Sequence, residues 1–482
     1  MLLLPAVLSA SVALAQSPLD IFHRRLEGGA TFYTEAEAAA LKAAAGNSDP
    51  ELRWQAVYAV SRWAEPRLAD VLAKAQADAD SRVRLFAVRA LGKLSGVPEA
   101  ARLSDPDLYV RAEAVSAFAA AKAFDKLPLS LFEDPSAHVR AAAANAAAAS
   151  GDGSRFGPPL ARLAASSGTM APGQALLALA KLEGAAARPA LERALKDPRW
   201  WLRARAYEAA GLLPEAGKLL ESGLRDPDPR VASQALETLA ASSSAAVVPA
   251  LYRALTDEGS PLEMRGTAAD VAAERKDPAL VLALLAALPD AVGPGAGEYR
   301  SSLTKALRAS VRPGTTEAAL VEAALKDFPP FLDSPRTLKP LNAPPSVVFE
   351  TEKGGFVVRL STEAPNHAAA FVESVTSGLY DGTQWHRVVT AFVVQGGDPR
   401  GSGWGDAGWR LADEKTAAPF LRGTVGMPKA GPDTGGCQLF VSLVPTPHLD
   451  GRYTAFGRVT QGLEVLDRLE PGDKILKATL RR

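Results

Sequence analysis

Three short stretches in the last third of this 482-residue chain carry side chains that could do chemistry. His386 and Arg387 are adjacent, so together they offer a proton-transfer group and a permanent cation. Cys437 is the only cysteine, so it could act as a nucleophile but cannot form an intrachain disulfide or a cysteine zinc cluster. The run from Gly403 to Gly408 has the G-x-G-x-x-G spacing of a nucleotide-binding loop.

Most of the enzyme classes that these stretches suggest lack the rest of their motif. No strand–loop–helix pattern surrounds Gly403–Gly408, and no acidic residue follows at the distance that would hold a ribose. The five histidines lie far apart without an HExxH pair, which excludes a zincin-type site. The sequence also has no GxSxG and no Walker motif. We therefore expect no metal, no nucleotide and no other cofactor.

Charge and composition narrow the class of protein further. The chain has 54 basic and 54 acidic residues, which argues against an electrostatic nucleic-acid or anionic-membrane surface. It is 47% hydrophobic and 22% charged, a globular composition with ample core. The length suggests roughly three domains.

Residues 1–15, MLLLPAVLSASVALA, form an apolar run that predicts a signal peptide. The run is shorter than the roughly 20 residues that span a bilayer, so we expect no stable membrane span. It ends in the small-residue pattern of Ala13 to Ala15, typical of a cleavage site. No Lys or Arg follows Met1, which leaves a buried first helix or a misplaced start codon as alternatives. We predict an exported bacterial protein, periplasmic or secreted.

An amphipathic helix recurs about every 30 residues between residues 34 and 326. In one copy, Val83, Phe86, Ala87 and Ala90 follow the i, i+3, i+4, i+7 spacing of one helix face. One unit cannot bury that face alone, whereas stacked units can. The pattern resembles the short, alanine-rich kind of HEAT repeat. This resemblance implies an α-solenoid that offers an extended surface to a protein partner.

An arginine and an Asp-Pro pair recur at fixed positions of these repeats. We favour a structural ladder of arginine and turn aspartate over a ligand-binding stripe. Asp-Pro pairs such as Asp105-Pro106 predict an aspartate N-cap followed by a proline in the first helical turn. The arginines are Arg53, Arg84, Arg111, Arg140, Arg203 and Arg265.

The adjacent Trp200 and Trp201 begin one repeat and allow two interpretations. They could form an exposed aromatic anchor for a partner. We favour the other interpretation, in which the pair is half core and half lid.

The periodicity changes after residue 326. Six prolines between Asp327 and Pro345 predict an extended, semi-rigid linker. Residues 346–361 alternate β-forming side chains around Lys353-Gly354, which predicts a hairpin. A helix from about residue 366 to 376, several short strands and a last short helix follow. These elements predict a closed β-barrel with two helices.

Four strings in this last segment look like the cyclophilin family of peptidyl-prolyl cis-trans isomerases. They stand in the family's order and cover residues 346–482: YDGTQWHRVV (380–389), AFVVQGGDP (391–399), GTVGMPKAGPDTGGCQLFVSL (423–443) and HLDGRYTAFGRV (448–459). The resemblance implies a proline-containing polypeptide as substrate.

The same resemblance assigns roles to individual residues. It makes Arg387 the catalytic residue and His386 a structural one, and it places Cys437 where the family has a small buried serine. The substrate-binding residues that it implies are Phe392, Val393, Phe440 and Leu449 in the proline pocket, Gln395 and Gln438 near the substrate backbone, Lys429 and Ala430 in the neighbouring groove, and His448 and Tyr453 at positions where other members have tryptophan and histidine.

Elementary chemistry agrees with this assignment. The barrier to rotation about an X-Pro bond, about 18–20 kcal/mol, comes from amide resonance. Lowering it requires an apolar pocket for the proline ring and a donor for the prolyl nitrogen, but no nucleophile or metal. The sequence departs from the family at Trp385, Val393, Pro428 and Lys429, and Pro428 has no N–H to donate in the groove.

We therefore predict a multidomain chain with a signal peptide (1–15), an all-α HEAT-repeat solenoid (34–326), a proline-rich linker (327–345) and a cyclophilin-like closed β-barrel with two helices (346–482). The expected function is isomerisation of X-Pro bonds during folding of exported proteins, with the solenoid recruiting a client or partner protein. The alternative is a scaffold that binds proline segments with little or no turnover.

Overall fold

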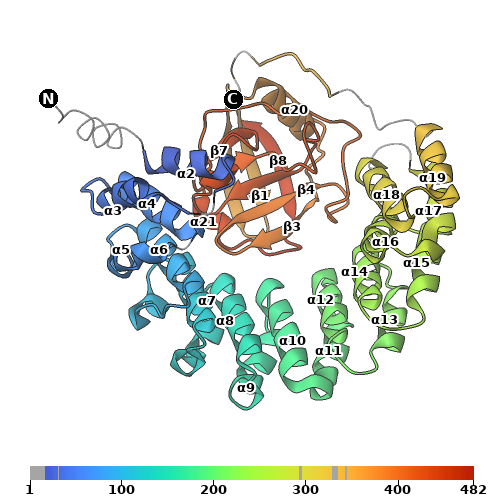
Figure 1. The fold of residues 1–482 in the computed structure, drawn as a ribbon, viewed down its shortest axis with the longest axis horizontal. Helices are drawn as coiled ribbons and strands as arrows, with labels where there is room; N and C mark the ends of the chain where they lie inside the picture. Colours follow the sequence, from blue (N-terminus) through green and yellow to red (C-terminus); the bar gives the residue numbers. More distant parts are fainter. Residues whose placement is uncertain are drawn as a thin grey trace. The chain divides into compact units, whose positions relative to one another are not determined.

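A computed structural model describes residues 17–481 except 31, 64, 292–295, 328–334, 342 and 344. The predicted signal peptide lies outside the described residues. Helices occupy the chain as far as Asp327, and strands begin at Ser346 (Figure 1). Within the described ranges, no helix combines the length and apolarity that crossing a membrane requires.

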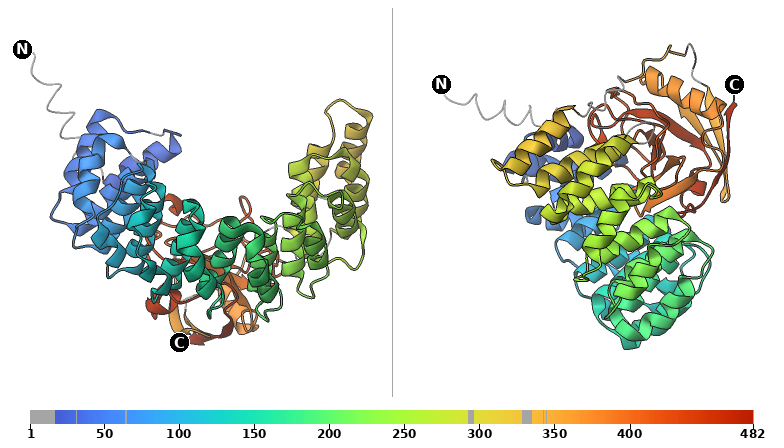
Figure 2. Two further views of the ribbon diagram at one scale, coloured as in Figure 1. Left: turned by 90° about the horizontal axis from the view of Figure 1, so that it is seen from below. Right: turned by 90° about the vertical axis from the view of Figure 1, so that its right-hand side faces the viewer.

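The helical part consists of successive short helices joined by turns (Figure 2). Within each compact unit, longer helices of successive repeats pack against one another, as α4 does against α6 and α14 against α16. The helices are α2 (Pro18–Glu27), α3 (Glu35–Ala45), α4 (Pro50–Trp63), α5 (Ala69–Ala75), α6 (Ser81–Lys93), α7 (Leu108–Ala120), α8 (Ala137–Ser150), α9 (Gly153–Ala164), α10 (Met170–Glu183), α11 (Arg188–Ala194), α12 (Trp200–Ala210), α13 (Gly217–Gly223), α14 (Pro229–Ala240), α15 (Val247–Thr256), α16 (Leu262–Arg275), α17 (Val281–Ala287), α18 (Ala296–Ser310) and α19 (Thr316–Asp327).

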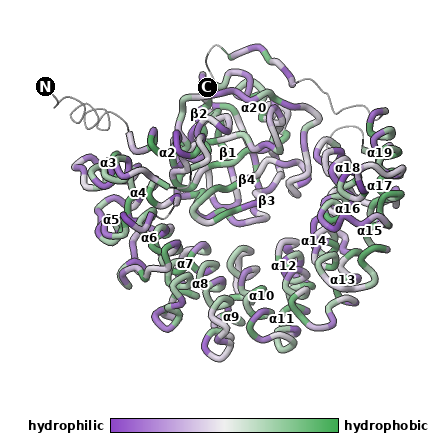
Figure 3. The backbone as a smooth tube through the Cα atoms, in the orientation of Figure 1, coloured by the Kyte–Doolittle hydropathy of each residue, from purple (hydrophilic) through white to green (hydrophobic). Residues whose placement is uncertain are grey.

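Small residues let neighbouring repeats pack closely. The predicted buried face of α6 is confirmed, since Val83, Phe86 and Ala90 have no exposed surface. At Gly92, a Cβ atom would lie 2.9 Å from the Cβ of Ala117 on α7, closer than side-chain carbons pack. The mixture of hydrophobic and hydrophilic positions along each helix is visible in Figure 3. The abundant alanine of this chain therefore sets the spacing of the helices.

The arginine ladder is confirmed. Five of the six arginines pair with the aspartate in the turn before a later helix, and all six donate to carbonyl oxygens just before their own helix. Among the described residues, Arg140 is the one that donates only to such carbonyls, those of Asp134 and Pro135. The ion pairs are Arg53–Asp78, Arg84–Asp105, Arg111–Asp134, Arg203–Asp226 and Arg265–Asp290.

The predicted N-caps are wrong by two residues. The cap of α7 is Asp107, whose carboxylate accepts from the N–H of Tyr109, and Asp105 precedes it. Asp105 accepts from the N–H of Asp107 and pairs with Arg84. The aspartate of the Asp-Pro pair thus accepts a backbone N–H within the turn and also pairs with the arginine of the ladder. It can do both because a carboxylate accepts several hydrogen bonds at once.

One repeat helix is capped from far along the chain. The N-terminus of α10 has no cap from its own Thr169 side chain. Instead, the buried carboxylate of Glu470 accepts from the N–H groups of Thr169 and Met170, at 2.7 and 2.8 Å. The Thr169 hydroxyl also donates to the carbonyl of Pro471. Glu470, which follows β7 in the chain, thereby accepts the free N–H groups at the start of α10, as a turn aspartate does at the start of other repeat helices.

The environment of Trp200 fits the interpretation of a half-buried side chain better than that of an exposed anchor. It is partly buried, and its indole N–H donates to Oε1 of Gln384 at 2.9 Å. Arg230 donates to the same oxygen, and its guanidinium lies 3.9 Å from the Trp200 ring centroid. The aromatic side chain therefore contacts this chain's own strand segment.

The strand-rich segment is a single sheet that curls into a closed barrel. In the described part of the chain, the sheet has eight strands in the order β3-β4-β6-β5-β7-β2-β1-β8. A bridge between Gln384 and Lys474 joins its two edges. The strands are β1 (Ser346–Thr351), β2 (Gly354–Leu360), β3 (Gln384–Val389), β4 (Val393–Asp398), β5 (Thr424–Gly426), β6 (Leu439–Ser442), β7 (Ala455–Gln461) and β8 (Ile475–Arg481).

The predicted hairpin and helices of the barrel are confirmed as β1–β2, α20 (Pro365–Thr376) and α21 (Leu463–Leu466). The barrel core contains the stacked rings of Phe349 and Phe356, 4.9 Å apart. The described part of the predicted linker is not a free spacer. Arg336 donates its N–H to the carbonyl of Arg410, and other groups of this segment also bond to the barrel.

Contacts divide the chain into two compact units, and the division does not follow the change from helices to strands. The first unit runs to Pro159 and also includes the two barrel loops 390–392 and 444–450. The second unit holds the later repeats and the rest of the barrel.

Candidate active site

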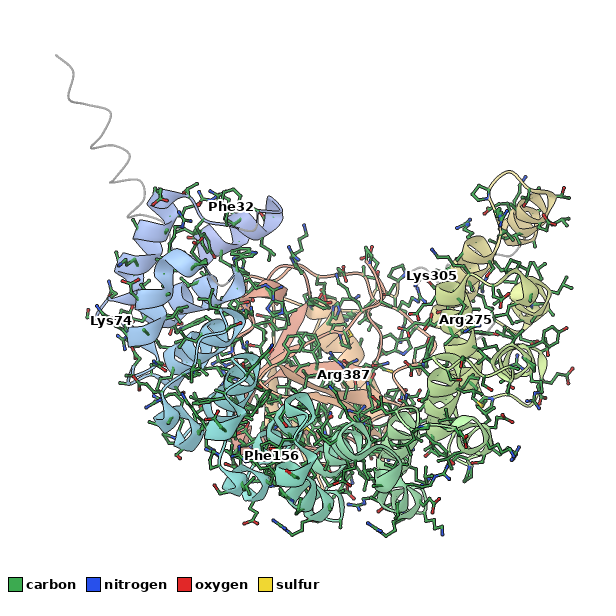
Figure 4. The ribbon with its side chains drawn as sticks, turned by 60° about the horizontal axis from the view of Figure 1, so that its bottom comes forward. Phe32, Lys74, Phe156, Arg275, Lys305 and Arg387 are labelled. Atoms are coloured by element: carbon green, nitrogen blue, oxygen red, sulfur yellow. The ribbon has the colours of Figure 1, made fainter. Side chains whose placement is uncertain are left out.

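The guanidinium of Arg387 is exposed on β3 of the barrel, where it is labelled in Figure 4. β3 pairs with β4 in a register that sets Arg387 opposite Gln395. Arg387 donates to Oε1 of Gln395 at 3.4 Å. The strand pair therefore presents a permanent cation at the surface and holds it against a neutral amide.

A chain of amide contacts fixes the direction of that guanidinium. The Nε2 group of Gln438 donates to the carbonyl oxygens of Gly403 and Gly405, both at 3.0 Å. Carbonyl oxygens only accept, so Gln438 must turn its own Oε1 toward Gln395, which donates to it at 3.0 Å. Gln395 is then left with its oxygen facing Arg387.

The glycine-rich loop is built around the buried carboxylate of Asp398, and this residue was missed by sequence reasoning. A Cβ atom on Gly405 would lie 1.8 Å from Oδ1 of Asp398, so only glycine fits there. The N–H groups of this loop thus donate to the chain's own carboxylate, whereas in a nucleotide-binding loop they would donate to a phosphate. Asp398 has no exposed surface and accepts from the N–H groups of Arg400, Ser402, Gly403 and Gly405. The signal for it was the Gly-Gly-Asp-Pro sequence directly before the glycine spacing.

Apolar side chains predicted for the proline pocket are buried on the barrel strands. Phe440 on β6 stacks with Phe420 at 5.5 Å between ring centroids and meets Tyr453 edge-on at 5.9 Å. Val393, the first residue of β4, is also buried. Phe440 and Tyr453 therefore lie together as the motif implied.

The other predicted pocket residues lie on the two loops of the first unit. Phe392 and His448 stack with ring centroids 5.6 Å apart and an interplanar angle of 21°. Leu449, next to His448, is buried. These loops thus bring together an aromatic pair that is separated by more than fifty residues in sequence.

The predicted groove residues line one cavity of about 210 Å³. Gln395, Gln438, Lys429 and Ala430 all contribute to it. The Lys429 ammonium pairs with Asp413 at 2.5 Å and lies 5.4 Å from the Tyr453 ring centroid. The lysine that departs from the family pattern is therefore held by a carboxylate beside the groove.

A repeat helix also lines this cavity, which sequence reasoning did not foresee. Gly297, Glu298 and Ser301 of α18 face the same space as Trp404 and the groove residues. Burial and the nearby carboxylate of Asp406 raise the pKa of Glu298. The later repeats thus contribute an acidic side chain to the wall of the groove.

Neither His386 nor Cys437 is suited to catalysis. Both are buried, in agreement with the structural roles predicted for them. Burial lowers the pKa of His386 to about 4, so its imidazole is neutral near neutral pH. Burial raises the pKa of the Cys437 thiol to about 12, so it carries no thiolate there.

Comparisons with known proteins follow the same division of the chain. Residues 346–479 match the family model of cyclophilin type peptidyl-prolyl cis-trans isomerases, and residues 37–103 and 217–308 match that of HEAT repeats. A peptidyl-prolyl cis-trans isomerase of Synechococcus elongatus is 42% identical over 138 residues, which cover 28% of this chain and 94% of the relative. One from Helicobacter pylori is 43% identical over 132 residues, covering 26% of this chain and 81% of the relative. A crystal structure of a cyclophilin type isomerase from Cryptosporidium parvum is 27% identical, covers 29% of this chain and 98% of that one, and has a TM-score of 0.27.

Proposed function

Because this chain belongs to the cyclophilin-type peptidyl-prolyl cis-trans isomerases, we propose that it speeds the isomerisation of X-Pro bonds in exported proteins as they fold. Unaided, such a bond turns over in tens of seconds, slowly enough to limit folding. The observation that carries the proposal is the exposed Arg387, aimed by Gln395 beside a groove that could receive an extended peptide.

The arrangement suits a reaction in which no covalent bond is made or broken. As the X-Pro bond twists, amide resonance is lost and the lone pair localises on the prolyl nitrogen. A guanidinium donates a hydrogen bond there without transferring a proton. Buried Phe440 and Val393 offer the ring an apolar surface, so the bound proline is held while the preceding carbonyl rotates. Neutral His386 and the protonated Cys437 thiol take no part.

The HEAT repeats indicate interaction with a protein partner. We propose that they bind the client or a partner that delivers it, which raises the local concentration of X-Pro bonds at the barrel. Export is supported by the apolar residues 1–15 and their small-residue end. Fractionation of cells that make the chain with and without residues 1–15 tests this part, because only the full chain should leave the cytoplasm.

The test of the activity itself separates an isomerase from a proline-binding scaffold. The full chain is assayed with a proline peptide in two ways, by isomerisation rate and by equilibrium binding. An isomerase accelerates exchange between the cis and trans peptide at substoichiometric concentration. Binding without acceleration would instead establish the scaffold and reject the enzyme.

A further inference from the structure

The first repeats bind the two barrel loops that carry Phe392 and His448. Tyr58 on α4 is almost fully buried, and its hydroxyl accepts from the backbone N–H of His448 at 3.2 Å. The same hydroxyl lies 2.9 Å from Nδ1 of the His448 ring. One hydroxyl can serve both groups, because it has one proton and two lone pairs. Tyr58 therefore fixes both the backbone and the ring of a predicted substrate-binding residue.

A second contact stabilises the residue before Phe392. Ala391 has φ +53, a left-handed conformation that non-glycine residues seldom adopt. Arg89 on α6 donates to the Ala391 carbonyl at 3.0 Å and to the carboxylate of Glu113 at 2.8 Å. The guanidinium thus holds a strained backbone segment, and Glu113 compensates its charge.

Two further repeat helices contact the same loops. Nδ1 of the buried His138 on α8 lies 3.0 Å from the Thr390 hydroxyl. Nε2 of His23 on α2 lies 2.9 Å from the Pro447 carbonyl. Both loops therefore have partners on more than one repeat. This agrees with their grouping in the first compact unit, apart from the rest of the barrel.

We propose that Tyr58 and Arg89 are positioning residues of the isomerase. They hold the two loops in the conformation that presents Phe392 and His448 to the substrate. This inference rests on the proposed function, since it takes both loop residues to be part of the substrate site. It gives the solenoid a role in substrate binding that is separate from recruitment of a partner.

The test uses the full chain with single substitutions. Tyr58→Phe removes the hydroxyl but keeps the ring that packs edge-on against Phe22 and Phe86. Arg89→Met removes the donor, and Arg89→Lys keeps the charge near Glu113. Arg82→Met is the matched control, because Arg82 is on the same helix but pairs with Asp80 and Glu51.

We expect Tyr58→Phe and Arg89→Met to raise KM about 3- to 10-fold, the scale of one lost hydrogen bond, with kcat nearly unchanged. Arg89→Lys should recover part of the loss, and Arg82→Met should match the wild type. In a His448→Ala background, Tyr58→Phe should raise KM less than it does in the wild type, because only the hydrogen bond to the backbone N–H of residue 448 is then left to lose. Unchanged KM in both test variants, or an equal rise in the control, would overturn the inference.

Peptide binding keeps this test separate from the proposed activity. If the wild-type chain binds a proline peptide without turnover, the proposed function fails. The dissociation constant of that peptide then replaces KM as the readout. The same 3- to 10-fold weakening is expected from the lost hydrogen bond, and equal affinity in all variants would overturn the positioning role.

Discussion

The one guanidinium proposed to act on the substrate is aimed by groups that lie behind it. Gln395 contacts Arg387, Gln438 contacts Gln395, and two loop carbonyls fix Gln438. Asp398 in turn fixes the loop through its backbone amides. The motif predicted the first three residues of this chain of contacts. It did not predict Asp398, because a buried carboxylate is recognised by the N–H groups around it and not by its sequence position.

Arg387→Ala should reduce kcat/KM about 100-fold, the scale of losing one preorganised donor. The side chain is exposed, so the melting temperature should stay close to that of the wild type. The kcat/KM of Arg387→Lys should lie between those of the wild type and the alanine variant, because an ammonium keeps the charge but not the planar array of N–H donors. A peptide isomerisation assay measures all three proteins, and wild-type turnover in the alanine variant would refute the catalytic assignment.

Asp398→Asn should lower both stability and activity. The amide retains one acceptor oxygen, but its NH2 group faces backbone donors, and each unsatisfied buried N–H costs about 1–3 kcal/mol. The displaced loop should also release Gln438 and hence Arg387. Asp433→Asn serves as the control, because Asp433 is exposed and accepts one loop N–H. The melting temperature and kcat/KM should both be lower for Asp398→Asn than for Asp433→Asn.

The buried His386 should make the barrel sensitive to acid. Its folded pKa, about 4, lies below its ordinary value of 6.5, so the unfolded chain binds the proton more readily. The stability that it contributes is complete above pH 6.5 and is lost as the pH falls toward 4. The ring is buried, so the apolar ring of His386→Phe should take its place without titrating. Chemical unfolding at pH 7 and 4.5 should show a smaller drop for the variant.

At the scale of single elements, predictability depended on whether the signal was local. Helical period and apolar spacing predicted the repeat helices, and alternation around Lys353-Gly354 predicted the β1–β2 hairpin. β8 was missed, because it becomes a strand only by pairing with β1 across the whole barrel sequence. The hydrogen bond between Trp200 and Gln384 could not be predicted either, since the two residues are 184 positions apart in the sequence.

The cap on α10 can be tested as an element of its own. Glu470→Ala should lower the free energy of unfolding by about 1–2 kcal/mol, as for other lost N-caps. Glu470→Gln should cost less, because the amide oxygen still accepts from Thr169 and Met170. Glu464→Ala, an exposed glutamate on α21, is the control. Equal unfolding free energies for the two alanine variants would contradict the capping role.

For the whole molecule, we expect the barrel to fold without the repeats but to need them for full substrate affinity. The barrel closes on itself, so residues 346–482 should fold alone and show a strand-rich circular dichroism spectrum. Without α4 and α6, however, the loops 390–392 and 444–450 lose their partners. We expect this fragment to have a KM at least about tenfold above that of the full chain, from several lost hydrogen bonds. Equal KM values would show that the repeats do not support the site.

The cap that Glu470 places on α10 also sets an order of events during synthesis. The first N–H groups of α10 leave the ribosome 300 residues before the carboxylate that they bind. At about 5–20 residues per second, that interval lasts roughly 15–60 seconds. Until nearly all of the barrel has been made, the N–H groups of Thr169 and Met170 at the start of α10 therefore lack the carboxylate that caps them. A chain that stops short of Glu470 never completes this repeat, so the same contact distinguishes finished chains from truncated ones.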